Sequence, residues 1–141
     1  MTGSRGFTLA GLTALCILAL PGCALIDTVV WGADGAEVIR ITEDLIDDLS
    51  ADGTTELICD GADVDLGAPA DWSGRGAGEP ERTGAAAAEQ DIPWAQWSIN
   101  IELLPLGASV GDSFPGDVLY RQTDDGLCVD DVPWTTREHV G

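Results

Sequence analysis

The sequence predicts an α+β domain in which one amphipathic helix packs on a small antiparallel sheet. Three observations lead to this prediction. Apolar residues recur at helical spacing between residues 34 and 50, apolar and polar residues alternate between 96 and 103, and two β-rich runs flank a turn near residue 125. A helix followed by successive strands is the element order of this class. The 141 residues amount to one ordinary domain, expected over residues 34–138.

The helix is expected to begin at Asp34 and to end near Ser50. Asp34 can cap the first turn, and Glu37 three residues later makes the start similar to a capping box. Acidic side chains occupy most of the outward positions, which is typical of a solvated face, although an acidic binding stripe is the alternative. The residues expected to face the core are Val38, Ile41, Thr42, Leu45 and Leu49.

The clearest strand prediction covers residues 96–103, where Trp97, Ile99 and Ile101 alternate with polar residues. The runs 118–122 and 127–132 flank an Asp-Gly step that suits a hairpin turn. Three strands in succession therefore favour an antiparallel sheet.

Residues 67–90 carry five Gly and two Pro and show no strong period. A stretch of this length and composition inside a small domain is typical of a functional or mobile loop. We expect a mobile loop there, including residues 75–82.

The first 22 residues are expected to be a cleaved signal peptide. Residues 1–6 are polar and carry one cation, Arg5, and residues 7–20 are uncharged and mostly apolar. That run is shorter than the roughly 20 residues that a membrane-spanning helix needs, and its layout is that of a secretory signal. A core helix is the alternative, but only Thr8 and Thr13 interrupt the apolar run.

Directly after this run stand Leu20-Pro21-Gly22-Cys23, an aliphatic residue, a tolerant position, a small residue and a cysteine. This motif resembles the lipobox of bacterial lipoprotein precursors. The resemblance implies cleavage before Cys23, a diacylglyceryl group on its sulfur, and a further acyl chain such as palmitate on the new amino group.

The resemblance also implies a protein exported and lipid-anchored on the outer face of the bacterial cell membrane, with residues 23–33 as its tether. Cleavage after Ala24 by ordinary signal peptidase, or an uncleaved short anchor, are the alternatives. The motif says nothing about the mature domain. A helix followed by a curved antiparallel sheet broadly resembles the cone-shaped nuclear-transport-factor-like domains in element order alone, and this resemblance implies no activity.

The cysteines divide into two uses. Cys16 leaves with the signal and Cys23 takes the lipid, so Cys59 and Cys128 remain in the mature chain. An even pair outside the cytoplasm usually forms a disulfide, which we expect here. A metal site is the alternative, but two thiols without a nearby His make a poor ligand set. We therefore expect no metal and no cofactor.

Charge and residue usage exclude several functions. All six basic residues are Arg and face 25 acids, giving a net charge of −19, which argues against a nucleic-acid partner. His139 is the only imidazole, lies near the C-terminus, and leaves no basis for a Ser-His-Asp or Cys-His arrangement. We expect a non-enzymatic domain that binds a protein, a glycan or a divalent cation. The alternative is a small hydrolase that uses carboxylates on an extracellular glycan.

Two groups of residues are candidate ligand contacts. Asp60, Asp63 and Asp65 depart from the spacing of a calcium loop, so a solvated turn is favoured over a specific site. Trp72 lies in the glycine-rich stretch and is the candidate ligand contact among the tryptophans, because an exposed ring can stack on a sugar. Core or edge packing is favoured over ligand contact for the five tryptophans taken together.

Overall fold

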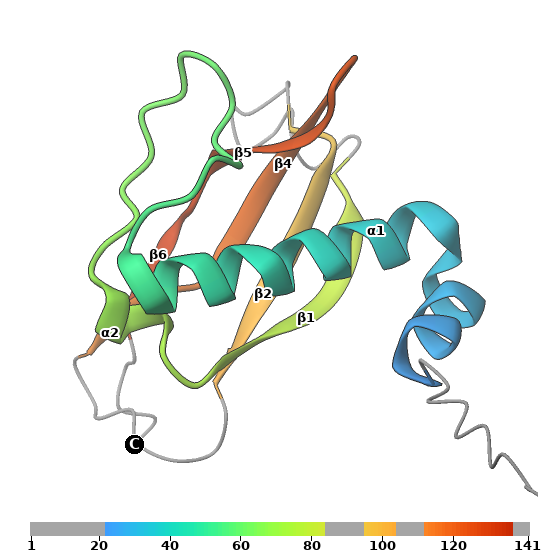
Figure 1. Cartoon of the computed structure of the whole chain (residues 1–141), viewed down its shortest axis with the longest axis horizontal. Coiled ribbons are helices and arrows are strands. Elements are labelled where there is room, and N and C mark those ends of the chain that lie inside the picture. Colours follow the sequence, from blue (N-terminus) through green and yellow to red (C-terminus); the bar gives the residue numbers. More distant parts are fainter. Residues whose placement is uncertain (1–21, 84–94, 104–111, 137–141) are drawn as a thin grey trace, which may run out of the picture.

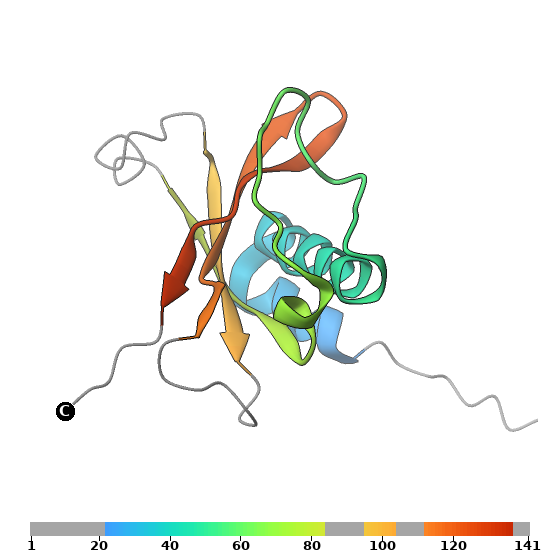
Figure 2. The same ribbon diagram turned by 90° about the vertical axis from the view of Figure 1, so that its left-hand side faces the viewer.

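The computed structural model describes residues 22–83, 95–103 and 112–136. The long helix α1 (Gly22–Asp52) crosses one face of a four-stranded antiparallel sheet, which confirms the predicted α+β class (Figure 1). Seen from the side, the helix and the sheet form two layers (Figure 2). The predicted signal peptide lies outside the described residues, except for Gly22. Within the described ranges, no helix is long and apolar enough to span a membrane.

The four-stranded sheet has the order β1-β2-β4-β5, and every neighbouring pair is antiparallel. A second sheet pairs two short strands, β3 with β6, and a one-turn helix, α2, packs against α1. The bounds of these elements are α2 Pro69–Trp72, β1 Arg75–Arg82, β2 Trp97–Leu103, β3 Ser113–Pro115, β4 Asp117–Thr123, β5 Gly126–Asp131 and β6 Trp134–Thr136.

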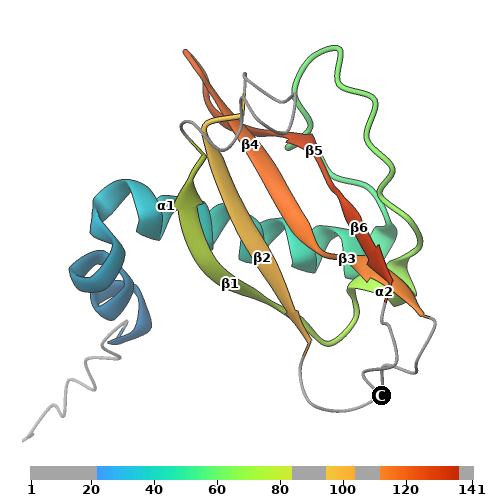
Figure 3. The same cartoon turned by 180° about the vertical axis from the view of Figure 1, so that it is seen from behind.

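The core lies between α1 and the sheet. The five residues expected on the apolar face of the helix are all buried, and so are Trp97, Ile99 and Ile101 of β2. Pairing of Ile99 with Val118 carries this buried row into β4. The apolar positions of the helix repeat every 3.6 residues and those of the strands every 2.0 residues. Both sets of side chains therefore pack in one layer between α1 and the sheet. The opposite face of the sheet has no described helix over it (Figure 3).

A buried polar contact fixes α1 on β4. The hydroxyl groups of Thr42 and Tyr120 lie 2.7 Å apart and share a hydrogen bond, and Thr42 also donates to the carbonyl of Val38 at 2.7 Å. Both residues are fully buried, and this burial raises the pKa of the Tyr120 hydroxyl. Because a buried hydroxyl without a partner is costly, the pair selects one position of the helix on the sheet.

The helix begins earlier than the sequence predicts. It starts at Gly22 instead of Asp34, and it is broken at Gly32, where φ is 74° and ψ is 175°. A residue with a side chain rarely adopts this φ, so glycine permits the break. The part from Asp34 onward corresponds to the predicted helix. Residues 23–31, which belong to the expected tether, are helical.

Residues 75–82, which the composition predicted to be a mobile loop, instead form the edge strand β1. The strand pairs with β2 through a register shift between Ala77 and Pro80. A Cβ atom at Gly78 would overlap the side chain of Asn100, whose Oδ1 accepts a 2.8 Å hydrogen bond from the backbone N–H of Glu79. Gly78 and Pro80 thus lie at a β-bulge in an edge strand, a position where glycine and proline are both tolerated. Residues 84–90 of the same stretch lie outside the described part.

Candidate functional site

The predicted disulfide between Cys59 and Cys128 is confirmed. It joins the segment after α1 to strand β5. Two backbone hydrogen bonds flank it, from Cys59 to the carbonyl of Val129 at 2.8 Å and from Val129 to the carbonyl of Leu57 at 2.7 Å. The bridge therefore fastens a long connection to the free edge of the sheet.

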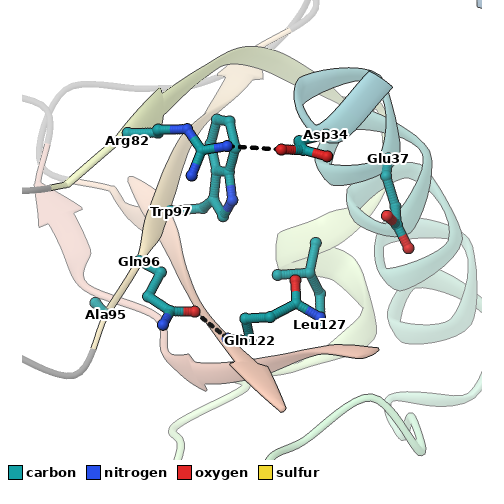
Figure 4. A pocket seen from close by; sticks show the side chains of 8 residues that line it. All are labelled: Asp34, Glu37, Arg82, Ala95, Gln96, Trp97, Gln122 and Leu127. Atoms are coloured by element: carbon teal, nitrogen blue, oxygen red, sulfur yellow. Dashed lines mark hydrogen bonds and ion pairs between the residues drawn. The ribbon is translucent and has the colours of Figure 1, made fainter. Parts of the chain in front are cut away.

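A pocket of about 560 Å³ opens between α1 and the sheet (Figure 4). We call it the Arg82 pocket. Its walls combine carboxylates from the helix with a cation, an indole and two amides from the sheet side. The residues that line it are Asp34, Glu37, Arg82, Ala95, Gln96, Trp97, Gln122 and Leu127.

Arg82 is the centre of this pocket. Its guanidinium stacks over the indole of Trp97, 4.3 Å from the ring centre, and its Nη2 lies 2.7 Å from Oδ2 of Asp34. The side chain of Arg82 is 64% exposed, whereas Trp97 is 8% exposed. The buried ring thus supports an accessible cation, an arrangement that a planar guanidinium favours.

The amide wall is also held in place. The side-chain oxygen of Gln96 accepts a 2.7 Å hydrogen bond from the backbone N–H of Gln122, and the backbone N–H of Gln96 donates to the carbonyl of Tyr120 at 2.8 Å. Two carboxylates, Asp34 and Glu37, outnumber the one cation. The pocket therefore disfavours an anion, while its mixture of donors and acceptors suits the hydroxyl groups of a neutral polar ligand.

The acids of the Arg82 pocket do not form the usual geometry of a glycoside hydrolase. Asp34 and Glu37 lie about one turn apart on α1, so they share one wall, and Asp34 is paired with Arg82 (Figure 4). Glycoside hydrolysis usually needs two carboxyl groups on either side of the bond to be cleaved.

A different acid pair lies on the sheet. Burial first, and the negative charge of Glu81 second, raise the pKa of the Asp117 carboxyl. Asp117 pairs with Asn100, and Glu81 with Ser98, on the side of β2 opposite its buried row. These acids thus belong to the open face of the sheet (Figure 3).

The candidate metal ligands do not form a cluster. Among the residues that the structure describes, no group of three or more His, Cys, Asp or Glu side chains could hold a metal ion. Asp65 instead shapes its own loop, since its carboxylate accepts a 3.0 Å hydrogen bond from the N–H of Gly67. Its carbonyl accepts another, at 2.9 Å, from the indole of Trp134.

Trp72, the candidate ligand contact, is a core residue, which agrees with the favoured packing interpretation. It is 0% exposed, and its indole nitrogen donates a 2.7 Å hydrogen bond to the carbonyl of Leu66. The short helix α2 turns this side chain inward, so its ring offers no surface to a sugar. Trp97, which the strand pattern had assigned only to the apolar face, does line a pocket.

Sequence reasoning did not single out Arg82. Asp34 and Arg82 are 48 residues apart, and no local pattern joins them. Comparison with protein-family models, with curated proteins and with solved structures finds no match for this chain.

Proposed function

We propose that this protein is an exported bacterial lipoprotein, anchored to the outer face of the cell membrane through Cys23, whose domain is a non-enzymatic binding module. The Cys59–Cys128 disulfide is the structural observation that carries the proposal, because such bonds persist in oxidising compartments outside the cytoplasm. It agrees with the lipobox-like Leu20-Pro21-Gly22-Cys23, which implies export by an independent route.

Substitution of the two N-terminal cysteines tests the anchor. In bacteria fed a palmitate analogue, Cys23→Ala should abolish labelling of the protein, because it removes the thiol that accepts the diacylglyceryl group. Cys16→Ala is the matched control and should leave the labelling unchanged, since Cys16 departs with the signal. Equal labelling of both variants would refute lipidation at Cys23.

The Arg82 pocket supports the binding part of the proposal, and a neutral glycan is the ligand class that fits it. Sugar hydroxyl groups can donate to Asp34 and Glu37 and accept from Arg82. An anionic ligand would meet an excess of carboxylates. The alternative, a carboxylate-dependent hydrolase acting on an extracellular glycan, draws support from the raised pKa of Asp117. The binding module is favoured because Asp117 lies on the open face of the sheet and is not one of the residues that line the Arg82 pocket.

An array of neutral and acidic oligosaccharides tests the pocket. The mature protein should bind neutral members, and Arg82→Ala should weaken that binding by about tenfold or more, since a hydrogen bond to a charged group contributes roughly 1.5–3 kcal/mol. Arg40→Ala is the control, because Arg40 is an exposed residue of α1 paired with Asp44. An equal loss in both variants, or cleavage of the sugars, would contradict the proposal.

A further inference from the structure

The large exposed apolar side chains of the described residues gather in the first ten positions of α1. We call residues 22–31 the N-terminal segment. Val29 is 86% exposed, the highest value of the group. Contiguous apolar exposure of this kind marks a surface that contacts a partner or a membrane. The full set is Leu25, Ile26, Val29, Val30 and Trp31.

The N-terminal segment turns away from the domain. The break at Gly32 gives residues 22–31 a different axis from the rest of α1, and the N-terminal segment lies beyond the edge of the sheet (Figures 1 and 3). A Cβ atom on Gly35 would come within 2.7 Å of the Cβ atom of Trp31. Glycines at positions 32 and 35 thus shape an elbow that holds the apolar residues clear of the core.

Four of the exposed apolar residues share one face of the helix. Residues 25, 26, 29 and 30 are spaced by one, three and four, so Leu25, Ile26, Val29 and Val30 fall on one side of the helix. Asp27 is the one charged residue of the N-terminal segment and falls outside this stripe. The apolar stripe therefore begins two residues after the proposed anchor at Cys23.

We propose that the N-terminal segment lies in the interfacial region of the outer leaflet, with its apolar stripe among the lipids. The inference rests on the proposed lipidation of Cys23 and goes beyond it, since acyl chains alone do not require the segment to enter the bilayer. A helix from residue 22 to 31 is roughly 15 Å long, so an anchor on Cys23 keeps the stripe beside the leaflet. Burial of apolar side chains on one helix face is what holds such helices at an interface.

The negative charge of the domain gives the break at Gly32 a role at the membrane. Loss of residues 1–22 removes Arg5 and no acid, so the mature chain is one charge more negative than the −19 of the full chain. Anionic lipids repel such a body at short range. The break at Gly32 lets the uncharged stripe enter the leaflet while the acidic face of α1 stays in water.

A spin label at position 29 tests this inference. In the mature protein Cys16 is gone, Cys23 carries lipid and Cys59 is bridged to Cys128, so Val29→Cys supplies a single free thiol for a nitroxide. The labelled, acylated protein is placed in phosphatidylcholine vesicles, and collisions with oxygen and with a water-soluble nickel chelate are compared. Glu43→Cys, at an exposed position later in α1, is the matched control.

The label at position 29 should collide more with oxygen than with the nickel chelate, while the label at position 43 should show the reverse. A label at position 29 that meets the nickel chelate as freely as that at position 43 would overturn the inference. Shielding from both reagents with spin–spin broadening would also overturn it, because a second copy would then cover the stripe. The acyl mass on Cys23, measured on the same sample, reports the proposed function separately.

Discussion

Loss of the Cys59–Cys128 disulfide should lower the free energy of unfolding by about 4 kcal/mol, in the chain-entropy account of a bridge that closes a long loop. The two cysteines are 69 residues apart, so the open chain gains much conformational freedom when unfolded. The bridge also holds the segment after α1 against the edge of β5. In the described residues this segment pairs with β5 only through one isolated β-bridge, between Ile58 and Val129.

Denaturant unfolding of the mature chain with and without reductant measures this effect. A Cys59→Ser, Cys128→Ser double variant is the control, and in the absence of reductant it should unfold at the same midpoint as the reduced protein. Unchanged unfolding on reduction would show that the bridge contributes nothing to stability. A reduced protein that differs from the double variant would mean that the reductant acts elsewhere.

Trp72→Ala should destabilise the domain by about 3–5 kcal/mol, the usual range for removal of a large buried aromatic side chain. The ring is fully buried, and its loss also leaves the carbonyl of Leu66 without its indole donor. Trp72→Phe keeps most of the packing and should cost less, about 1–3 kcal/mol, through the unpaired carbonyl and the smaller ring.

Trp134→Ala is the matched comparison, because this indole is only half-buried and also donates to a backbone carbonyl, that of Asp65. It should destabilise less than Trp72→Ala in the same unfolding assay. If Trp72→Ala left stability unchanged and abolished glycan binding instead, Trp72 would be a ligand contact and its place in the core would be wrong.

Local periodicity made part of the fold predictable. The helix face from Val38 to Leu49 and the alternation along β2 were read correctly, because each pattern repeats within one element and reports the burial of its own face. The hairpin of β4 and β5 was likewise predictable from its Asp-Gly step, since the turn chemistry lies in adjacent residues.

The errors arise where burial depends on distant partners. β1 has the composition of a loop, but pairing with β2 overrides that preference, and Gly78 is needed where Asn100 crosses the bulge. Trp72 is buried because α2 docks on α1, which no pattern near residue 72 reports. The Arg82 pocket is likewise tertiary, because its cation and its carboxylates come from separate elements.

The conformation of the N-terminal segment could not be predicted from its sequence either. Residues 24–32 are mostly apolar, so the sequence permits a strand, a buried tether or a helical turn there, and composition alone does not choose. The structure makes the segment helical and leaves Val29 and Val30 exposed. Exposed apolar side chains are unfavourable in water unless an apolar surface covers them. The proposed lipid anchor on Cys23 would hold the stripe against the bilayer, which is such a surface.

The intact mass of the protein purified from bacterial membranes tests the central claim most directly. The expected protein begins at Cys23, carries the added mass of a diacylglyceryl group with or without a further acyl chain, and is lighter by two hydrogen atoms because of the Cys59–Cys128 bridge. A mature chain that begins elsewhere, or that begins at Cys23 without any acyl mass, would contradict the account.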